Sequence, residues 1–274
     1  MPRIGSEGEG PEVPEDGGDG GGGEGVQLQQ AGAAGRDSAA KSHSSPALIS
    51  PHIMVFPKLV PRSTLFFLCD VQTKFRPAIY GYEHVVATSN KMIKLAKLLG
   101  IEVVCTTQNT KALGPNDPAI DLPSLGPLLV GNCDKTLFSM LTPEVQTILD
   151  ARPALNSIVI FGIETVLSVL ASGKYTPHVV ADGVSSCNSF EIPIALDRMR
   201  ADGAVIGTSE SIAFQLMSDA ASPSFKSFSK FIKDDKESTK VVGEALLQGR
   251  ISPSSSKDVE VASGGVVLGI KSAM

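Results

Sequence analysis

The sequence predicts a three-layer α/β/α fold built on a mostly parallel sheet of about six strands, with Rossmann-like topology. Short apolar runs of strand length alternate with longer stretches of helical periodicity along most of the chain after residue 60. The apolar runs are continuous, as expected of strands that are buried on both faces. Connections of helix length between consecutive strands favour parallel pairing, because parallel strands need a long crossover.

The predicted elements follow one another in regular order. Strands are expected at 64–69, 101–106, 157–161, 178–181 and 204–206, with a weaker one at 128–131. Helices are expected over 82–99, from 142 onward, over 189–202 and 209–217, and over 225–247 as one helix or a pair. Gly100 stands where a C-cap is needed, and Pro143 occupies the first helical position after the capping residue Thr142.

Composition divides the chain into three parts. Residues 1–50 hold 12 of the 27 glycines and no aromatic residue, so they cannot bury enough apolar surface to offset their ordering entropy. We therefore expect a disordered leader over 1–55 and one α/β domain over 60–247. The Ser- and Gly-rich residues 248–274 are expected to form a flexible tail.

Charge and cysteine usage exclude several classes of function. The net charge is −5 and no run is rich in Lys or Arg, so neither nucleic acid nor an anionic membrane is expected as partner. No apolar stretch reaches the roughly 18–20 residues that span a bilayer, and the acidic N-terminus is unlike a signal or transit peptide. Four widely spaced cysteines indicate reduced thiols and no metal site: Cys69, Cys105, Cys133 and Cys187. These features predict a cytoplasmic protein; a homo-oligomer is left open.

Polar side chains gather where predicted strands end. In an open parallel sheet the ligand lies beyond the carboxyl ends of the strands, where the strand order reverses. This rule selects Asp70, Gln72, Gln108, Lys135, the 162–168 turn and Asp182. By spacing alone Asp70 could instead be a loop or capping aspartate, and Lys135 a solvated surface lysine. A nucleotide-binding Rossmann protein is disfavoured because no GxGxxG turn follows the first strand, so no cofactor is expected.

Six motifs, in order, resemble those of isochorismatase-like hydrolases of the cysteine hydrolase superfamily, most closely the eukaryotic isochorismatase domain-containing proteins. They cover roughly residues 60–235 and read FFLCDVQTKFRPAI (66–79), LGIEVVCTTQNTKALG (99–114), KTLFSM (135–140), IVIFGIET (158–165), ADGVSSCN (181–188) and GTSESIAFQL (207–216). The resemblance implies hydrolysis of a small amide, vinyl ether or carbamoyl-type substrate by an Asp–Lys–Cys triad. Asp70 and Lys135 match its first two members, and Gln72, Gln108 and Thr165 are expected to contact the substrate.

The third member of the triad departs from the pattern. The family has a short His-x-Cys segment after Glu-Thr, whereas here Glu164-Thr165 runs directly into Val166-Leu-Ser-Val-Leu170. This passage is about six residues shorter than the family pattern implies, which brings the connection close to the minimum of roughly 10–12 residues for a βαβ crossover. Ser168 and Cys187 are the nearest substitutes, although each fits an ordinary helix or loop position better.

Three explanations fit the missing segment. The sequence comes from a mis-spliced or wrongly predicted gene model, or the protein is a catalytically inactive small-molecule-binding or scaffolding pseudoenzyme, or another residue is the nucleophile. We favour the first explanation, because drift replaces residues one at a time whereas a splice error removes a block.

Removal of residues 1–50 should leave the melting temperature nearly unchanged, because a segment that packs against nothing contributes little to stability. Thermal denaturation of the full and the trimmed chain measures this effect. A fall of several degrees on trimming would contradict the expected disorder.

Overall fold

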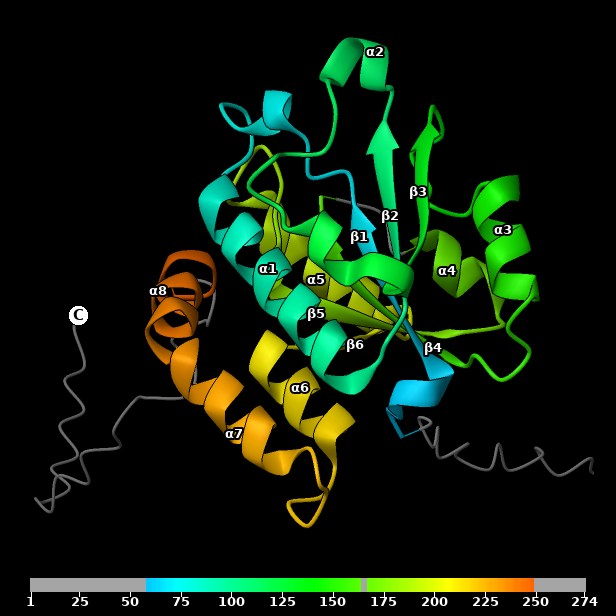
Figure 1. Cartoon of the computed structure of the whole chain (residues 1–274). Helices are drawn as coiled ribbons and strands as arrows, with labels where there is room; N and C mark the ends of the chain where they lie inside the picture. Colours follow the sequence, from blue (N-terminus) through cyan, green and yellow to red (C-terminus); the bar gives the residue numbers. More distant parts are fainter. Residues whose placement is uncertain (1–57, 164–166, 249–274) are drawn as a thin grey trace, which may run out of the picture. The chain divides into compact units, whose positions relative to one another are not determined.

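Six strands form one parallel sheet in the order β3-β2-β1-β4-β5-β6 in a computed structural model, which describes residues 58–163 and 167–248 (Figure 1). Every neighbouring pair is parallel. The chain adds strands outward from β1 to β3 and then places β4 on the other side of β1. The strand order therefore reverses between β1 and β4, the point at which such sheets bind their ligands. The strands are β1 (Thr64–Cys69), β2 (Val103–Gln108), β3 (Leu129–Lys135), β4 (Ser157–Gly162), β5 (Thr176–Val184) and β6 (Val205–Gly207).

Helices cover both faces of the sheet (Figure 1). One face carries α1 (Tyr82–Leu99), α6 (Ser209–Met217), α7 (Phe225–Asp234) and α8 (Lys236–Leu246). The other face carries α3 (Pro143–Asp150), α4 (Leu167–Ser172) and α5 (Glu191–Ala201). Short helical segments complete the connections: η1 (Pro61–Ser63), η2 (Thr73–Phe75), α2 (Thr110–Leu113) and η3 (Leu122–Leu128).

The apolar side chains of β1 pack alternately against the helices on the two faces of the sheet. Phe66 and Leu68 belong to the core beneath α1, where the ring of Phe66 meets that of Phe161 edge-on at 5.9 Å between centroids. Leu65 and Phe67 face the core formed with α3, α4 and α5. All six residues of β1 are buried. This two-sided burial is the reason that the run shows no alternation of polar and apolar residues.

The predicted fold class is confirmed, and the differences lie at the ends of elements. The weak strand expected at 128–131 extends to Lys135, which is thus the last residue of β3 rather than a residue after it. The strand expected at 178–181 runs from Thr176 to Val184, so Asp182 lies inside it. The pairing of β4 with β5 is interrupted by a register shift after Ile160, and a sequence pattern does not show where pairing resumes. The final helical stretch is a pair, α7 and α8.

Several predicted features lie outside the described residues. They are the expected leader over 1–55, residues 249–274 of the expected tail, and Thr165 with the rest of the short segment 164–166. Among the helices of the described ranges, none combines the length and the apolar character that crossing a membrane requires.

Gly162 allows the ends of β1 and β4 to approach closely. Its φ is +109°, and a Cβ atom at this position would lie 2.2 Å from the carbonyl oxygen of Cys69. The same carbonyl accepts a hydrogen bond of 2.7 Å from the backbone N–H of Ile163. Only glycine fits here, because the obstructing atoms belong to the backbone of the neighbouring strand and cannot turn aside.

Gly162→Ala should destabilise the domain more than Gly100→Ala, a matched change at another positive φ. Gly100 has φ +66° and open space around its Cβ position, so its replacement costs only the strain of about 1–2 kcal/mol. The clash at position 162 should add at least about 2 kcal/mol. Urea denaturation of both variants measures the difference, and equal losses would show that the strand ends have room to separate.

Candidate functional site

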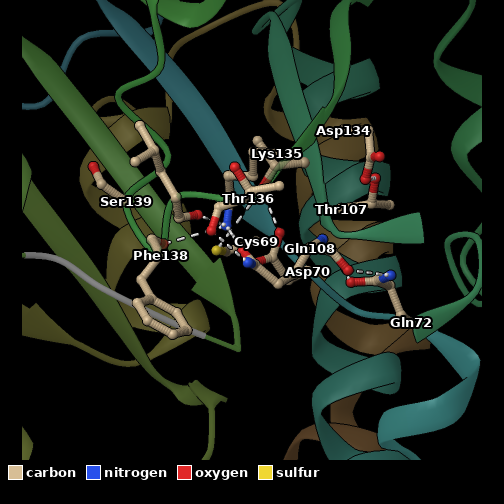
Figure 2. Close-up of polar contacts among 12 residues, drawn as sticks. Cys69, Asp70, Gln72, Thr107, Gln108, Asp134, Lys135, Thr136, Phe138 and Ser139 are labelled. Atoms are coloured by element: carbon tan, nitrogen blue, oxygen red, sulfur yellow. Dashed lines mark hydrogen bonds and ion pairs between the residues drawn. The ribbon is translucent and has the colours of Figure 1, made fainter. Parts of the chain in front are cut away.

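A buried ion pair lies at the carboxyl edge of the sheet, beside the reversal of strand order. The ammonium of Lys135 is 2.6 Å from Oδ2 of Asp70, and their side chains are 1% and 5% exposed. Asp70 directly follows β1 and Lys135 ends β3, so the pair reaches across β2 between two strands that are not neighbours. Figure 2 shows Asp70, Lys135 and Gln108 pointing toward one another at this edge. Lys135 is therefore not a solvated surface lysine.

Oxygen atoms surround the ammonium of Lys135. Besides the Asp70 carboxylate it donates to Oε1 of Gln108 at 2.8 Å and to the carbonyls of Leu137 and Phe138 at 3.1 and 3.2 Å. The two carbonyls come from the loop that follows β3, and the ring of Phe138 is turned away from the pair (Figure 2). Four acceptors for three protons satisfy the charge of a lysine that has lost its water.

Asp70 is held from β2 as well. Oγ1 of Thr106 donates to Oδ1 of Asp70 at 2.7 Å, and the Asp70 N–H donates to the Thr106 carbonyl at 3.2 Å. The backbone of Asp70 has φ +49°, a left-handed conformation that costs most residues other than glycine about 1–2 kcal/mol. The strain and the hydrogen bonds together turn the carboxylate back over the edge of the sheet toward Lys135.

Gln72 and Gln108 have different surroundings. The Gln72 side chain is buried, and its Oε1 accepts from the Gln108 N–H at 2.7 Å while its Nε2 donates to the carbonyls of Gln108 and Gly114. A substrate contact by Gln72 would have to replace one of these bonds. Gln108 is partly exposed and joins Lys135 to the backbone carbonyl of Thr136 through its amide. Substrate binding by either residue stays a prediction, and Thr165 lies outside the described residues.

A second polar cluster fixes the loops that carry Gln72. Both carboxylate oxygens of the buried Asp117 bind the guanidinium of Arg76, at 2.8 and 2.9 Å. The hydroxyl of Tyr82 donates to Asp117 and lies 2.8 Å from the carbonyl of Gln72. Burial raises the pKa of Asp117, but hydrogen bonds from Ala119, Tyr82 and Arg76 more than offset this and leave it below the usual range. Burial also raises the pKa of Tyr82, so its proton stays in place.

Asp182 was expected at the ligand site with Asp70 and Lys135, but it contacts Ser209 instead. Both of its oxygens accept from Ser209, from the N–H and the hydroxyl, at 2.6 Å each. Ser209 begins α6 and also contacts the ammonium of the buried Lys91 on α1 at 3.0 Å. Burial lowers the pKa of Lys91, and the negative charge of Asp182 opposes this. This network joins β5 to α1 and α6 rather than to the Asp70–Lys135 pair.

Two of the buried cysteines, Cys105 and Cys133, have raised pKa values. Burial raises the pKa of the Cys105 thiol, whose Sγ also lies 3.4 Å from Oδ1 of Asn116. Burial and Glu144 raise the pKa of Cys133 to about 11. Cys69 is buried within the strand end, and Cys187 is exposed in the loop after β5. Within residues 58–163 and 167–248, no three His, Cys, Asp or Glu side chains gather closely enough to hold a metal ion.

Some residues of the site were not selected from the sequence. Thr106 was the chief omission, although its signal was present, since it is the first residue of the Thr-x-Gln turn. The carbonyl groups of Leu137 and Phe138 could not have been found, because any residue supplies a carbonyl and only the path of the loop aims it.

Comparison with known proteins agrees with this architecture. Residues 64–211 match the family described as the isochorismatase domain. Isochorismatase domain-containing protein 2 of Homo sapiens is 39% identical over 202 residues, which are 71% of this chain and 94% of that protein. The protein of the same name from Xenopus laevis is 41% identical over 183 residues, 65% of this chain and 87% of its own. Among solved structures, the MAR1 ribonuclease from Caenorhabditis elegans superposes with a TM-score of 0.58 at 29% identity, covering 65% of this chain and 93% of that one.

The losses of stability on replacing Asp70 and Lys135 should not be additive, because each buried charge depends on the other. Lys135→Met leaves a buried carboxylate without its cation, which should lower the free energy of unfolding by about 3–5 kcal/mol. The double variant Asp70→Asn/Lys135→Met should lose clearly less than the sum of the two single variants. Urea denaturation gives the coupling.

Lys94→Met is the matched control for this measurement. Lys94 forms an ion pair of similar length with Asp235, 2.7 Å, but its side chain is 56% exposed, so its loss should cost at most about 1 kcal/mol. Additive losses at positions 70 and 135 would mean that the two charges do not depend on each other.

Proposed function

Because this chain belongs to the isochorismatase family, we propose that it keeps the small-molecule site of an isochorismatase-like hydrolase but lacks the covalent step. The substrate class is a small amide, vinyl ether or carbamoyl-type compound. The observation that supports this best is the buried Asp70–Lys135 pair at the switch point of the sheet. A buried ion pair is weak evidence for stability alone, since apolar residues of similar volume often pack as well.

The chemistry of the pair suits acyl transfer. In a complete triad, Asp70 accepts the thiol proton, the thiolate attacks the substrate carbon, and the leaving group departs with a proton before water releases the product. Lys135 places a positive charge where negative charge develops on the substrate. Without a thiolate the two residues still bind and polarise a substrate, but no covalent intermediate can form.

The positions of the cysteines support the second half of the proposal. Cys105 and Cys133 hold their protons firmly, since burial is the main cause of the raised pKa of each. A nucleophilic cysteine needs the opposite, a pKa lowered by a nearby base or cation. Cys187 is exposed and Ser168 is the second residue of the short helix α4. Each is a less suitable nucleophile than a cysteine at the turn after β4.

A binding or scaffolding pseudoenzyme is the alternative function. In the leading proposal, one block of residues that carries the nucleophile is missing from a hydrolase. In the alternative, no block is missing and the protein only binds small molecules or acts as a scaffold. Sequencing the transcript across codons 160–175 separates the two, because a restored block would return the His-x-Cys segment. Cytoplasmic location and a homo-oligomer stay predictions.

The name of the Caenorhabditis elegans neighbour raises RNA hydrolysis as another activity. The charge of this chain does not favour it. RNA binding draws on clustered Lys and Arg side chains, whereas this chain has a net charge of −5.

This chain should be nearly inactive toward small amides, and inserting a six-residue His-x-Cys-type segment after Thr165 should raise turnover. The expected gain is roughly 10³–10⁶-fold, the range lost when a triad nucleophile is removed. The insertion should also raise the melting temperature, because it relieves the short crossover between β4 and β5. Turnover of a panel of small amides and thermal denaturation measure the two effects.

The same insertion with Ala in place of Cys is the matched control. It should raise the melting temperature alone, which separates the length of the crossover from the nucleophile. Iodoacetamide should label the inserted cysteine faster than the four native ones, since a triad thiol is largely ionised. Brisk turnover without the insertion, lost in both Asp70→Asn and Lys135→Ala, would place the nucleophile elsewhere, with Ser168 and Cys187 the first residues to change.

A further inference from the structure

A cavity lies at the amino end of the sheet, opposite the edge that carries Asp70 and Lys135. His178 is the third residue of β5, and Leu59 precedes β1. Ser218 follows the last residue of α6, which runs back along the sheet from the carboxyl edge. The cavity has a volume of about 830 Å³ and is lined by Lys58, Leu59, His178, Arg200, Ala204, Val205, Ile206, Phe214, Gln215 and Ser218. Its size falls in the range of small-molecule pockets.

His178 is a buried polar side chain without the hydrogen bonds that buried polar groups normally make. It is only 2% exposed, and neither ring nitrogen has a hydrogen-bond partner in the described part of the chain. Burial lowers its pKa to about 4, so the ring is neutral and carries one donor and one acceptor. An unsatisfied buried polar group is a cost that an aliphatic side chain in β5 would avoid. Native structures satisfy nearly all such groups, so this one calls for a partner.

The remaining lining combines positive charge with an apolar wall. Lys58 and Arg200 are cations, and no carboxylate lines the cavity. Arg200 pairs with Asp197 at 2.7 Å, but both side chains are more than half exposed, so this pair is weak and exchangeable. Arg200 also lies in the last turn of α5, where a cation is favourable in any protein. The preference for an anionic ligand therefore rests on Lys58 together with Arg200, and the neutral His178 adds a hydrogen-bond donor.

We infer that this cavity is a second small-molecule site, which takes a small aromatic carboxylate. The carboxylate lies against Lys58 and Arg200, the ring lies against Val205 and the half-exposed Phe214, and the N–H of His178 donates to the ligand. The ring nitrogens of His178 have almost no accessible surface, so contact between the ligand and these nitrogens requires a lining side chain to move. Lysine and arginine side chains at a surface do this readily, because they have many rotamers.

Benzoate titrated into the full chain tests the site. The imidazole resonances of the four histidines are followed by NMR, and calorimetry gives the affinity. Benzoate should shift the His178 signals saturably, and benzyl alcohol should bind at least about tenfold more weakly because it has no charge. Arg200→Gln and His178→Phe should each weaken benzoate binding by about tenfold.

Arg198→Gln is the matched control for Arg200→Gln. Arg198 lies on the same helix and is also more than half exposed, but it pairs with Asp202 and does not line the cavity, so the affinity should not change. Arg200 is at the surface, so its variant keeps the fold even where His178→Phe does not. Absence of a His178 shift at 10 mM benzoate, on the order of the weakest specific affinities, would overturn the inference. An affinity equal in Arg200→Gln and the parent chain would do the same.

Discussion

A charge pair buried between strands that do not touch determines the geometry of the carboxyl edge. Asp70 comes from the end of β1 and Lys135 from the end of β3, and neither charge can be left alone once water is excluded. The ammonium also collects the Gln108 amide and two carbonyls of the loop after β3. The ends of three strands and one loop therefore adopt their positions together.

The charge pair and the crossover between β4 and β5 lie on opposite sides of the reversal of strand order. Asp70 and Lys135 come from the side formed by β1, β2 and β3, where Thr106 and Gln108 hold them in place. The nucleophile of such a family belongs to the crossover between β4 and β5, on the other side of the reversal of strand order. Within the described residues the Lys135 ammonium binds Asp70, Gln108 and the carbonyls of Leu137 and Phe138, none of which belongs to that crossover. The proposed function therefore combines an intact charge pair with the loss of the covalent step.

Buried polar groups at the two ends of the sheet differ in whether they have hydrogen-bond partners. At the carboxyl edge each side-chain nitrogen and oxygen atom of Asp70, Lys135 and Gln72 has a hydrogen-bond partner within the protein. At the amino end His178 has none among residues 58–163 and 167–248, although it is equally buried. A fully paired network fixes a geometry, whereas an unpaired group stores a cost that a ligand can remove.

The sequence by itself determined the fold class and the two charged residues of the site. Continuous apolar runs of strand length, alternating with helical periodicity, favour strands buried on both faces. Residues that end parallel strands share one edge of the sheet, which selects Asp70 and Lys135 among several polar residues, and the resemblance to the family motifs singles out these two. Only the tertiary structure decided which neighbours complete the site. The Leu137 carbonyl and the close approach at Gly162 depend on register and loop path, which no local pattern encodes. The same limit applies to Asp182, whose partner Ser209 is 27 residues away along the chain and meets it only when α6 packs against β5.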